Sequence, residues 1–396
     1  MFILNLLLIS TAVVIAIPAA MFCGEVLLAV VWGERKQKSP EQTTSLSYAV
    51  LIPAHNEQAV IQKTLQILLP TISAGNRVIV VADNCSDNTA EIAQRCGATA
   101  IERTDTSRRG KGFALDFGIS YLADNPPDVV VFLDADCRVD EQTASTLAAT
   151  AHQSGCPVQG LNLCDPDPRG GVLQMISGLA FRFKNLVRPL GLTRLVGMTH
   201  LTGTGMALPW ALVNRAQVAS SNVVEDMQLG IDLALSGYRT KFIPAAHVNS
   251  PLPQQRSAAT TQRTRWEHGH LRTLLTQVPK LALRAFATRR PFLLILALDL
   301  AIPPLSLLVM GNVAFCLLAL IAWLCGSSAV PAIIAGSALL SIAGCVLLGW
   351  AAYCRQQIPL RALLLAPLYA LWKVPLYVAF LWKRQQQWVR TARDAS

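Results

Sequence analysis

The chain has 396 residues, of which 52% are hydrophobic and 15% are charged, and its formal net charge is +10. Residues 1–32 and 292–382 are almost entirely apolar while the middle carries most of the charge, which argues against an ordinary soluble protein and predicts a soluble domain between membrane segments. The basic residues gather beside the apolar segments rather than among interleaved aromatics, so we expect no nucleic-acid partner.

The first apolar stretch, residues 2–32, is long enough to span a membrane. The basic stretch 34–38 follows it, and the positive-inside rule then places the N-terminus outside and residue 34 onward in the cytoplasm. A cleaved signal peptide is the alternative, but no basic residue precedes the apolar stretch. The ten cysteines include no Cys-x-x-Cys pair, which disfavours a zinc site and fits a reducing cytoplasm.

From residue 48 the hydrophobic pattern alternates between strands and helices. We expect strands at 49–53, 77–82, 98–102, 128–133, 158–164, 201–208 and 240–243. Helices are expected at 59–69, 90–96, 113–122, 141–154, 172–188 and 227–236. This alternation predicts the α/β fold class, with a mostly parallel sheet and right-handed crossovers.

The C-terminal third is predicted to lie on or in the membrane. An amphipathic, arginine-rich helix at 262–283 suits the interface, and 291–324 and 329–353 read as two spans, the first with Asp299 inside it. Lys373 and the repeated prolines make 360–382 a broken, interfacial or re-entrant segment in our interpretation. The predicted parts are a transmembrane helix (1–33), a cytoplasmic α/β domain (45–255), interfacial helices (256–290), two transmembrane helices (291–354) and a membrane-interface segment with a basic tail (358–396).

One strand ends abruptly in two carboxylates, Asp134 and Asp136. Lying two apart in an extended segment, they would point the same way, and their oxygens suit a hard divalent cation such as Mg²⁺ or Mn²⁺. An acidic turn after a core strand is the alternative. Other polar groups follow strand ends or begin helices: His55-Asn56-Glu57, Asp83-Asn84, Lys111 and Glu225-Asp226. Carboxylates gathered at one sheet edge repel each other without a cation, and a metal-bound nucleotide-sugar diphosphate explains them together.

These motifs together resemble the membrane-bound family-2 inverting glycosyltransferases of the GT-A fold, the branch with cellulose, chitin and hyaluronan synthases and ceramide glucosyltransferases. The resemblance covers about residues 48–270 and the membrane layout on either side. The matching positions are the opening motif 51–57 with Pro53, Asn56 and Glu57, then Asp83, Asp134-Ala135-Asp136, Glu225-Asp226, and Gln262-Arg263-Thr264-Arg265-Trp266.

The resemblance assigns roles to these residues. It implies that Asp226, beside Glu225, is the base that takes the acceptor proton, and that Asp83 contacts the uracil and ribose. It implies a metal on Asp136 with Asp134 in support. In the Gln262 motif, Arg265 adds positive charge and Trp266 an aromatic wall. Lys111 either contacts the nucleotide or belongs to a solvated basic loop.

We therefore expect a membrane enzyme that transfers sugar with inversion from a nucleotide sugar, expected to be UDP-linked, to a glycan or lipid-linked acceptor. The setting would be exopolysaccharide or cell-envelope glycan synthesis, with other assembly proteins as partners. The few membrane segments weaken polymer extrusion and leave single transfer to a lipid open. A non-catalytic nucleotide-binding membrane subunit is the alternative of another class, and a small transporter is disfavoured because the soluble middle is too large.

Overall fold

The computed structural model describes residues 1–34, 46–164, 171–213, 224–250 and 256–382. The chain forms two compact units. Of the described residues, the α/β unit comprises 46–164, 197–213, 224–250 and 256–266, and the helical unit comprises 1–34, 171–196 and 267–382. Residues 171–196, which we expected inside the cytoplasmic domain, thus belong to the helical unit. The basic stretch 35–38 and the basic tail lie outside the described residues.

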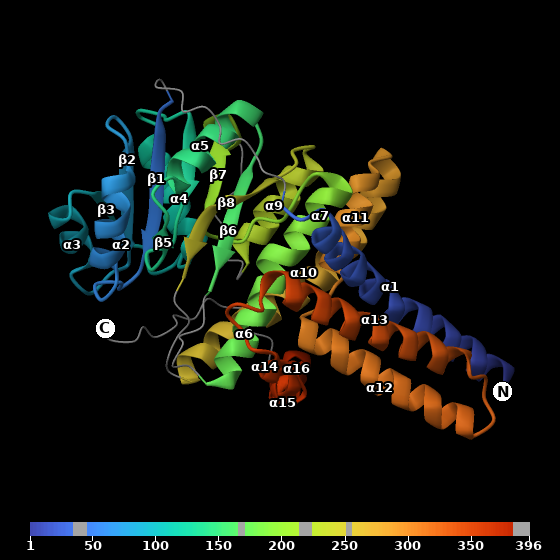
Figure 1. Ribbon diagram of the computed structural model, residues 1–396. Coiled ribbons are helices and arrows are strands. Elements are labelled where there is room, and N and C mark those ends of the chain that lie inside the picture. The colour runs from blue at the N-terminus through green and yellow to red at the C-terminus, as the bar shows by residue number, and fades with distance from the viewer. Residues whose placement is uncertain (35–45, 165–170, 214–223, 251–255, 383–396) are drawn as a thin grey trace. The chain divides into compact units, whose positions relative to one another are not determined.

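The α/β unit is built on an eight-stranded mixed sheet with the order β3-β2-β1-β4-β7-β6-β8-β5 (Figure 1). β1 to β4 are mutually parallel, β6 and β8 are parallel to each other, β7 runs antiparallel to β4 and β6, and β5 is antiparallel to β8. The strands are β1 (Tyr48–Ala54), β2 (Arg77–Asp83), β3 (Thr99–Arg103), β4 (Val129–Phe132), β5 (Arg138–Val139), β6 (Val158–Leu163), β7 (Met206–Pro209) and β8 (Lys241–Asn249).

Both faces of this sheet are buried, which explains why its central strands are continuous apolar runs. Val50 and Val131 point into one core with residues of α2, α3 and α5, whereas Leu51 and Val130 point into a second core with α4, α8 and α9. The helices are α2 (Ile61–Leu68), α3 (Thr89–Arg95), α4 (Lys111–Leu122), α5 (Thr143–Ser154), α8 (Trp210–Val213) and α9 (Glu225–Leu235), with a short 3₁₀ turn at Leu69–Thr71. The sheet that carries the polar loops at its edge is thus packed between two hydrophobic cores.

The strand predicted at 201–208 was wrong in its first half. Only Met206–Pro209 forms β7, and the preceding residues form a turn in which Gly203 and Gly205 have left-handed φ angles of 88° and 65°. Left-handed residues at these two positions turn the chain out of the extended conformation, so the regular strand begins only at Met206. The strand expected at 240–243 is longer than predicted and runs to Asn249, and β5 was not predicted.

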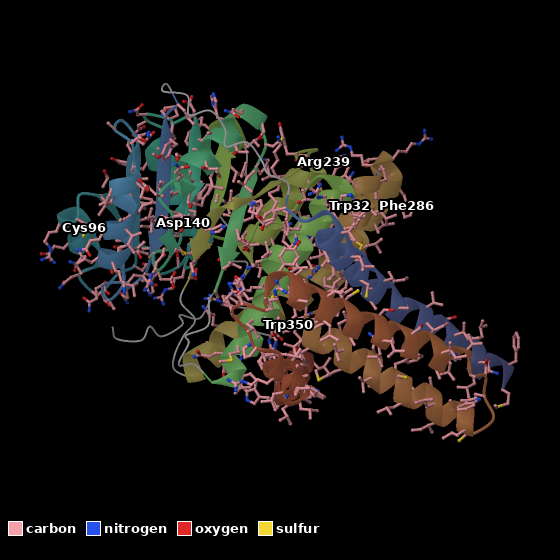
Figure 2. The ribbon with its side chains drawn as sticks, in the orientation of Figure 1. Trp32, Cys96, Asp140, Arg239, Phe286 and Trp350 are labelled. Atoms are coloured by element: carbon pink, nitrogen blue, oxygen red, sulfur yellow. The ribbon has the colours of Figure 1, made fainter. Side chains whose placement is uncertain are left out.

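Among the residues that the structure describes, three helices of the helical unit are long and apolar enough to cross a membrane: α1 (Phe2–Trp32), α12 (Leu305–Leu324) and α13 (Val330–Tyr353). The other helices are α6 (Val172–Arg182), a π-helical turn (Phe183–Val187), α7 (Arg188–Val196), α10 (Arg256–Thr288), which begins in the α/β unit, α11 (Pro291–Leu300), α14 (Leu360–Leu364), α15 (Ala366–Trp372) and α16 (Val374–Trp382). Trp350 of α13, labelled in Figure 2, donates its ring N–H to the carbonyl of Ile358 (2.8 Å) and fixes the turn after that helix.

The helix predicted to run unbroken over 291–324 is interrupted, although its second part, Leu305–Leu324, is long and apolar enough to cross a membrane. The chain leaves the helical conformation at Ala301–Pro304, where Pro303 and Pro304 supply no backbone N–H, so α11 and α12 are separate. Asp299 therefore lies at the end of a short helix. Its carboxylate accepts a hydrogen bond from Arg188 (2.6 Å), which also donates to the fully buried Glu25 of α1 (2.9 Å). One guanidinium thus lies between two buried carboxylates.

Lys373 is the residue that complicated the C-terminal segment. It is 4% exposed, pairs with Glu267 of α10, and places its ammonium 4.7 Å from the centre of the Tyr369 ring. His268 also hydrogen-bonds the carbonyl of Leu376 (2.9 Å). The segment is broken into α14, α15 and α16, and its place at a membrane interface stays a prediction.

Candidate active site

The loops after β1 and β2 are fastened to each other at the carboxyl edge of the sheet. Asn56 adopts a left-handed φ of 54° and its side-chain oxygen accepts the backbone N–H of Ser86 (2.7 Å). The backbone N–H of Glu57 donates to the hydroxyl of Thr89 (2.8 Å), the first residue of α3. Pro53 lies within β1 and precedes this loop. The opening motif therefore builds the wall of a site, and direct ligand contact by its three predicted residues stays a prediction.

Lys111 connects three elements of the acidic centre. It is the first residue of α4, and its ammonium contacts the carboxylate of Asp134 and donates to the carbonyl of Gly203 (2.7 Å). The backbone N–H of Asp134 donates to the hydroxyl of Thr204 (3.0 Å). The 203–205 turn, which was predicted as a strand, thus provides the carbonyl that binds Lys111. This geometry does not match the alternative of a solvated basic loop.

Glu225 and Asp226 lie in the first turn of α9, where the helix dipole favours negative charge. A Cβ atom placed on Gly203 would lie 2.9 Å from Asp226 Oδ2 and 3.6 Å from Lys111 Nζ. The Asp226 carboxylate and the Lys111 ammonium therefore both flank Gly203, and only glycine leaves room between them. The Gly-punctuated stretch 203–205 was visible in the sequence but was not assigned to the site.

The electrostatics of this cluster follow from its burial. Burial alone would lower the pKa of Lys111, but the charges of Asp134 and Glu225 raise it, so the lysine stays charged. Burial, and then the neighbouring Asp226, raises the pKa of Glu225 from 4.5 to about 7. Near neutral pH the two adjacent carboxyl groups are thus not both fully ionised.

Asp134, Asp136 and Cys137 place one ligand atom each within 4.8 Å of one another. The Cys137 sulphur contacts the hydroxyls of Thr204 (3.3 Å) and Ser250 (3.1 Å), and burial raises its pKa to about 12, so it stays a thiol. The remaining donors are carboxylate oxygens, which fit Mg²⁺ or Mn²⁺ rather than a thiolate-bound metal. Because Lys111 already compensates Asp134, Asp136 is the stronger candidate ligand.

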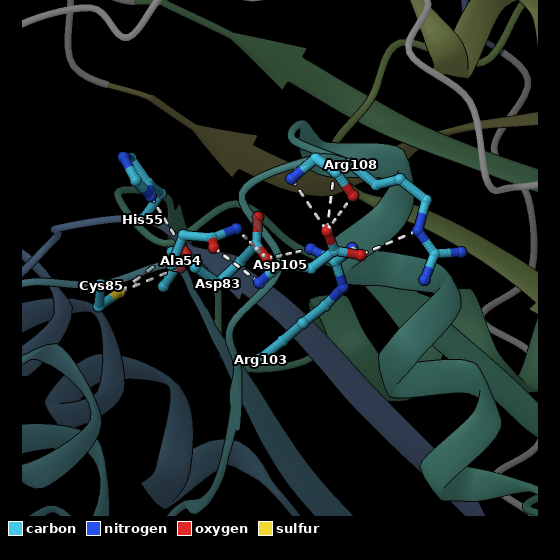
Figure 3. A network of polar contacts seen from close by, with 9 residues as sticks. Ala54, His55, Asp83, Cys85, Arg103, Asp105 and Arg108 are labelled. Atoms are coloured by element: carbon cyan, nitrogen blue, oxygen red, sulfur yellow. Dashed lines mark hydrogen bonds and ion pairs between the residues drawn. The ribbon is translucent and has the colours of Figure 1, made fainter.

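Asp83 belongs to a second group of contacts, shown in Figure 3. It ends β2, is 5% exposed, and accepts a hydrogen bond from Arg103 (2.6 Å). His55 Nδ1 hydrogen-bonds the backbone carbonyl of Asp83 (2.7 Å). Sequence reasoning missed Arg103, although β3 runs parallel to β2 and pairs Arg103 with Asp83 in register.

Gln262, Arg265 and Trp266 lie along α10, in the part of that helix that belongs to the α/β unit. All three are partly exposed. Their roles toward a nucleotide or an acceptor stay predictions.

Comparison with known proteins identifies the family. Residues 46–269, more than half of the chain, match the family described as "Glycosyltransferase like family 2". The chain belongs to this family. The match begins just before β1 and ends just after Trp266, so it contains both groups of site residues.

Curated relatives of this glycosyltransferase include the probable glycosyltransferase YdaM of Bacillus subtilis, which is 27% identical over 60% of this chain and 57% of its own. The 4,4'-diaponeurosporenoate glycosyltransferase of Staphylococcus haemolyticus is 29% identical over 49% and 53%. The poly-beta-1,6-N-acetyl-D-glucosamine synthase of Staphylococcus aureus is 25% identical over 57% and 55%. The chain thus spans little more than half the length of these relatives.

Among solved structures, the mannosyltransferase PcManGT from Pyrobaculum calidifontis, in complex with GDP-Man and Mn²⁺, is similar. Its TM-score is 0.55 at 19% sequence identity, over 96% of this glycosyltransferase and 100% of that chain. The similarity confirms the predicted GT-A fold.

The raised pKa of Glu225 predicts a pH dependence of stability. Between about pH 4.5 and 7 the folded glycosyltransferase binds a proton that the unfolded chain has released, so the free energy of unfolding falls as the pH rises. In Glu225→Gln the free energy of unfolding should decrease by about 1–3 kcal/mol less over this pH range than in the wild type. The measurement is the difference in melting temperature between about pH 5 and 8 in EDTA. The exposed Asp116→Asn on α4 is the control and should keep the wild-type difference, and an equal difference in Glu225→Gln would contradict the assignment.

Proposed function

We propose that the chain is a membrane glycosyltransferase that transfers a sugar with inversion from a nucleotide sugar, most simply a UDP-sugar, to a hydroxyl of a glycan or lipid-linked acceptor. The observation that carries the proposal is the meeting of Asp226 and Lys111 at Gly203, with Asp134 bound to the same lysine. A base, a fixed cation and the metal-binding motif then lie at one sheet edge of a family-2 glycosyltransferase.

Each side chain has a separate task in this reaction. Asp226 takes the proton of the acceptor hydroxyl. As it loses this proton, the hydroxyl oxygen attacks the anomeric carbon of the donor sugar while the bond from that carbon to the nucleotide diphosphate breaks. Lys111 holds Asp134 in place and keeps positive charge near the departing phosphates. Asp136, supported by Asp134, would hold Mg²⁺ or Mn²⁺, which neutralises negative charge on the leaving diphosphate. Arg265 adds charge and Trp266 an aromatic surface from α10.

The names of the relatives support two kinds of acceptor. One relative is a polysaccharide synthase, and another is named for transfer to diaponeurosporenoate. Processive synthesis and single transfer to a lipid therefore remain two forms of the proposal. After incubation with labelled sugar nucleotide and membrane extract, a ladder of products on a gel would support the first and a single product the second.

The alternative of another class is a membrane subunit that binds nucleotide without turnover. The paired Lys111 and Asp134, with Asp226 beside them, favour the enzyme, because a non-catalytic site has no need to hold a base there. Nucleotide release from a panel of UDP- and GDP-sugars by the purified chain separates the two classes. Binding without release from any donor would favour the subunit.

The metal proposal predicts that Asp136→Ala abolishes nucleotide release, because the diphosphate charge is left uncompensated in a partly dry site. The loss should exceed about 100-fold and should not be restored by raising Mn²⁺. The exposed Asp140→Ala is the matched control and should keep wild-type turnover. Full wild-type activity in EDTA would remove the metal from the mechanism.

The base is tested by Asp226→Asn. Asp226 is the second residue of α9 and not its cap, so asparagine keeps the shape of the side chain and costs the helix only about 0.3–1 kcal/mol of favourable charge–dipole energy, while the proton acceptor is lost. Turnover should fall about 10²–10⁴-fold with little change in donor affinity. Glu225→Gln is the neighbouring comparison and should lose less. If Asp226→Asn turns over at a near-normal rate, Glu225 becomes the residue to test as the base.

The membrane proposal places the catalytic domain in the cytoplasm and the protein in the inner or plasma membrane. α1, α12 and α13 are the proposed spans, and α12 and α13 are joined by the short turn that contains Gly326. Reporters at residue 40 and at the C-terminus should both give a cytoplasmic signal, while a reporter at residue 326 should give an external one. An external C-terminus would mean that 360–382 crosses the membrane.

A further inference from the structure

The carboxylate of Asp83 is held by a buried arginine that the mechanism above does not use. Arg103 donates through Nη1 to Asp83 Oδ1 (2.6 Å) and through Nη2 to Asp105 Oδ2 (3.0 Å). The side chains of Arg103 and Asp83 are each 8% exposed, and the guanidinium lies 5.8 Å from the centre of the Phe113 ring. One planar guanidinium therefore bridges the ends of β2 and β3 (Figure 3).

Asn84 closes this bridge into a ring of hydrogen bonds. Its φ is 52°, a left-handed conformation that asparagine tolerates. In that conformation its backbone N–H donates to the carbonyl of Arg103 (2.7 Å), and its side-chain amide donates to Asp83 Oδ1 (3.0 Å). Its side-chain oxygen accepts the backbone N–H of Asp105 (2.8 Å). Both the side chain and the loop of Asp83 are thus fixed in orientation.

Stability alone gives little reason for this arrangement. A buried ion pair often contributes no more to folding than apolar residues of the same volume would, because both charges lose their water. The ring of hydrogen bonds does fix the orientation of the Asp83 carboxylate. Oδ1 of Asp83 is used twice, and in the described part of the chain no hydrogen bond goes to Oδ2. The carboxylate paired with Arg103 presents one oxygen in a fixed direction, and that oxygen is a hydrogen-bond acceptor.

We propose that Arg103 and Asn84 are positioning residues that aim Asp83 Oδ2 at an N–H group on the base of the donor nucleotide. The inference rests on the proposed function and adds a reason for base selection. Uracil offers its imide N3–H and guanine offers N1–H, whereas cytosine and adenine carry unprotonated acceptor nitrogens at those ring positions. A fixed acceptor therefore favours UDP or GDP over CDP or ADP.

The loop that follows ties this group to the phosphate end of the site. Asp105 accepts hydrogen bonds from the hydroxyl of Ser107 (2.6 Å) and from Arg108 Nε (2.9 Å), and these contacts lower its pKa. Six residues after Asp105 the chain reaches Lys111 and α4. Ser107 and Arg108 hold Asp105 independently of Arg103, so the loop before Lys111 keeps these contacts when Arg103 is replaced.

The test compares two probes that differ in the nucleoside, measured by calorimetry on the full-length protein in detergent with Mn²⁺. The probes are inorganic pyrophosphate and whichever of UDP and GDP binds the wild type more tightly. In Arg103→Met the nucleotide affinity should fall at least about 10-fold, or about 1.4 kcal/mol, while pyrophosphate affinity stays within about twofold. In the same variant, the ratio of the affinity for UDP or GDP to the affinity for CDP or ADP should become smaller than in the wild type. Arg103→Lys keeps the charge but not the planar fork, and should recover part of the loss.

Two further variants keep the test decisive. Arg95→Met removes an arginine from an exposed pair with Glu91 (3.8 Å) and should leave both probes unchanged. If Arg103→Met does not fold, Asn84→Gly carries the test, since it removes the amide that donates to Asp83 Oδ1 at a position whose φ of 52° glycine adopts freely, and it should also weaken nucleotide but not pyrophosphate. Equal losses for both probes, or none, in a folded variant would overturn the positioning role. A wild-type protein that binds neither UDP nor GDP would instead overturn the proposed function.

Discussion

The ammonium group of Lys111 is the interaction on which the rest of the site depends. Asp134 follows β4 while Glu225 and Asp226 begin α9, and three carboxylates gathered in a partly buried site would repel one another by several kcal/mol. The lysine lies among them because α4 begins at Lys111 and because the 203–205 turn offers a carbonyl instead of a strand. The left-handed glycines of that turn are therefore part of the electrostatics as well as of the backbone.

The same arrangement, one cation among several carboxylates, recurs in the helical unit. There a single guanidinium, Arg188, lies between Glu25 and Asp299, which come from helices far apart in the sequence. Removing one partner of such a buried group leaves an uncompensated charge, which is far more costly than never having had the group. The three helices α1, α7 and α11 are thus specified as neighbours by polar contacts within an otherwise apolar body.

Much of this could be predicted from the sequence, and the failures have physical causes. The buried strands predicted the α/β class, because β-branched runs are local signals, and the resemblance carried by the motifs and their order implied the GT-A fold. The turn at 201–205 and the break at 301–304 were missed because apolar composition outweighed glycine and proline in our interpretation. Arg103, Thr204 and the partner of Lys373 could not be found, since each depends on a contact between residues distant in the chain.

The pairing of Lys373 with Glu267 bears on how the enzyme can be divided. Glu267 follows Trp266 directly in α10. The helix that carries the Gln-x-x-Arg-Trp motif therefore also carries the carboxylate that forms a buried ion pair with Lys373 of the C-terminal segment. A shortened chain that ended after α10 would leave that carboxylate without its cation and would uncover Leu271, which packs against Tyr377 and Phe380. These contacts lie within the helical unit, so the family match, which stops at residue 269, ends inside α10 and short of the partners that Glu267 and Leu271 find in the C-terminal segment.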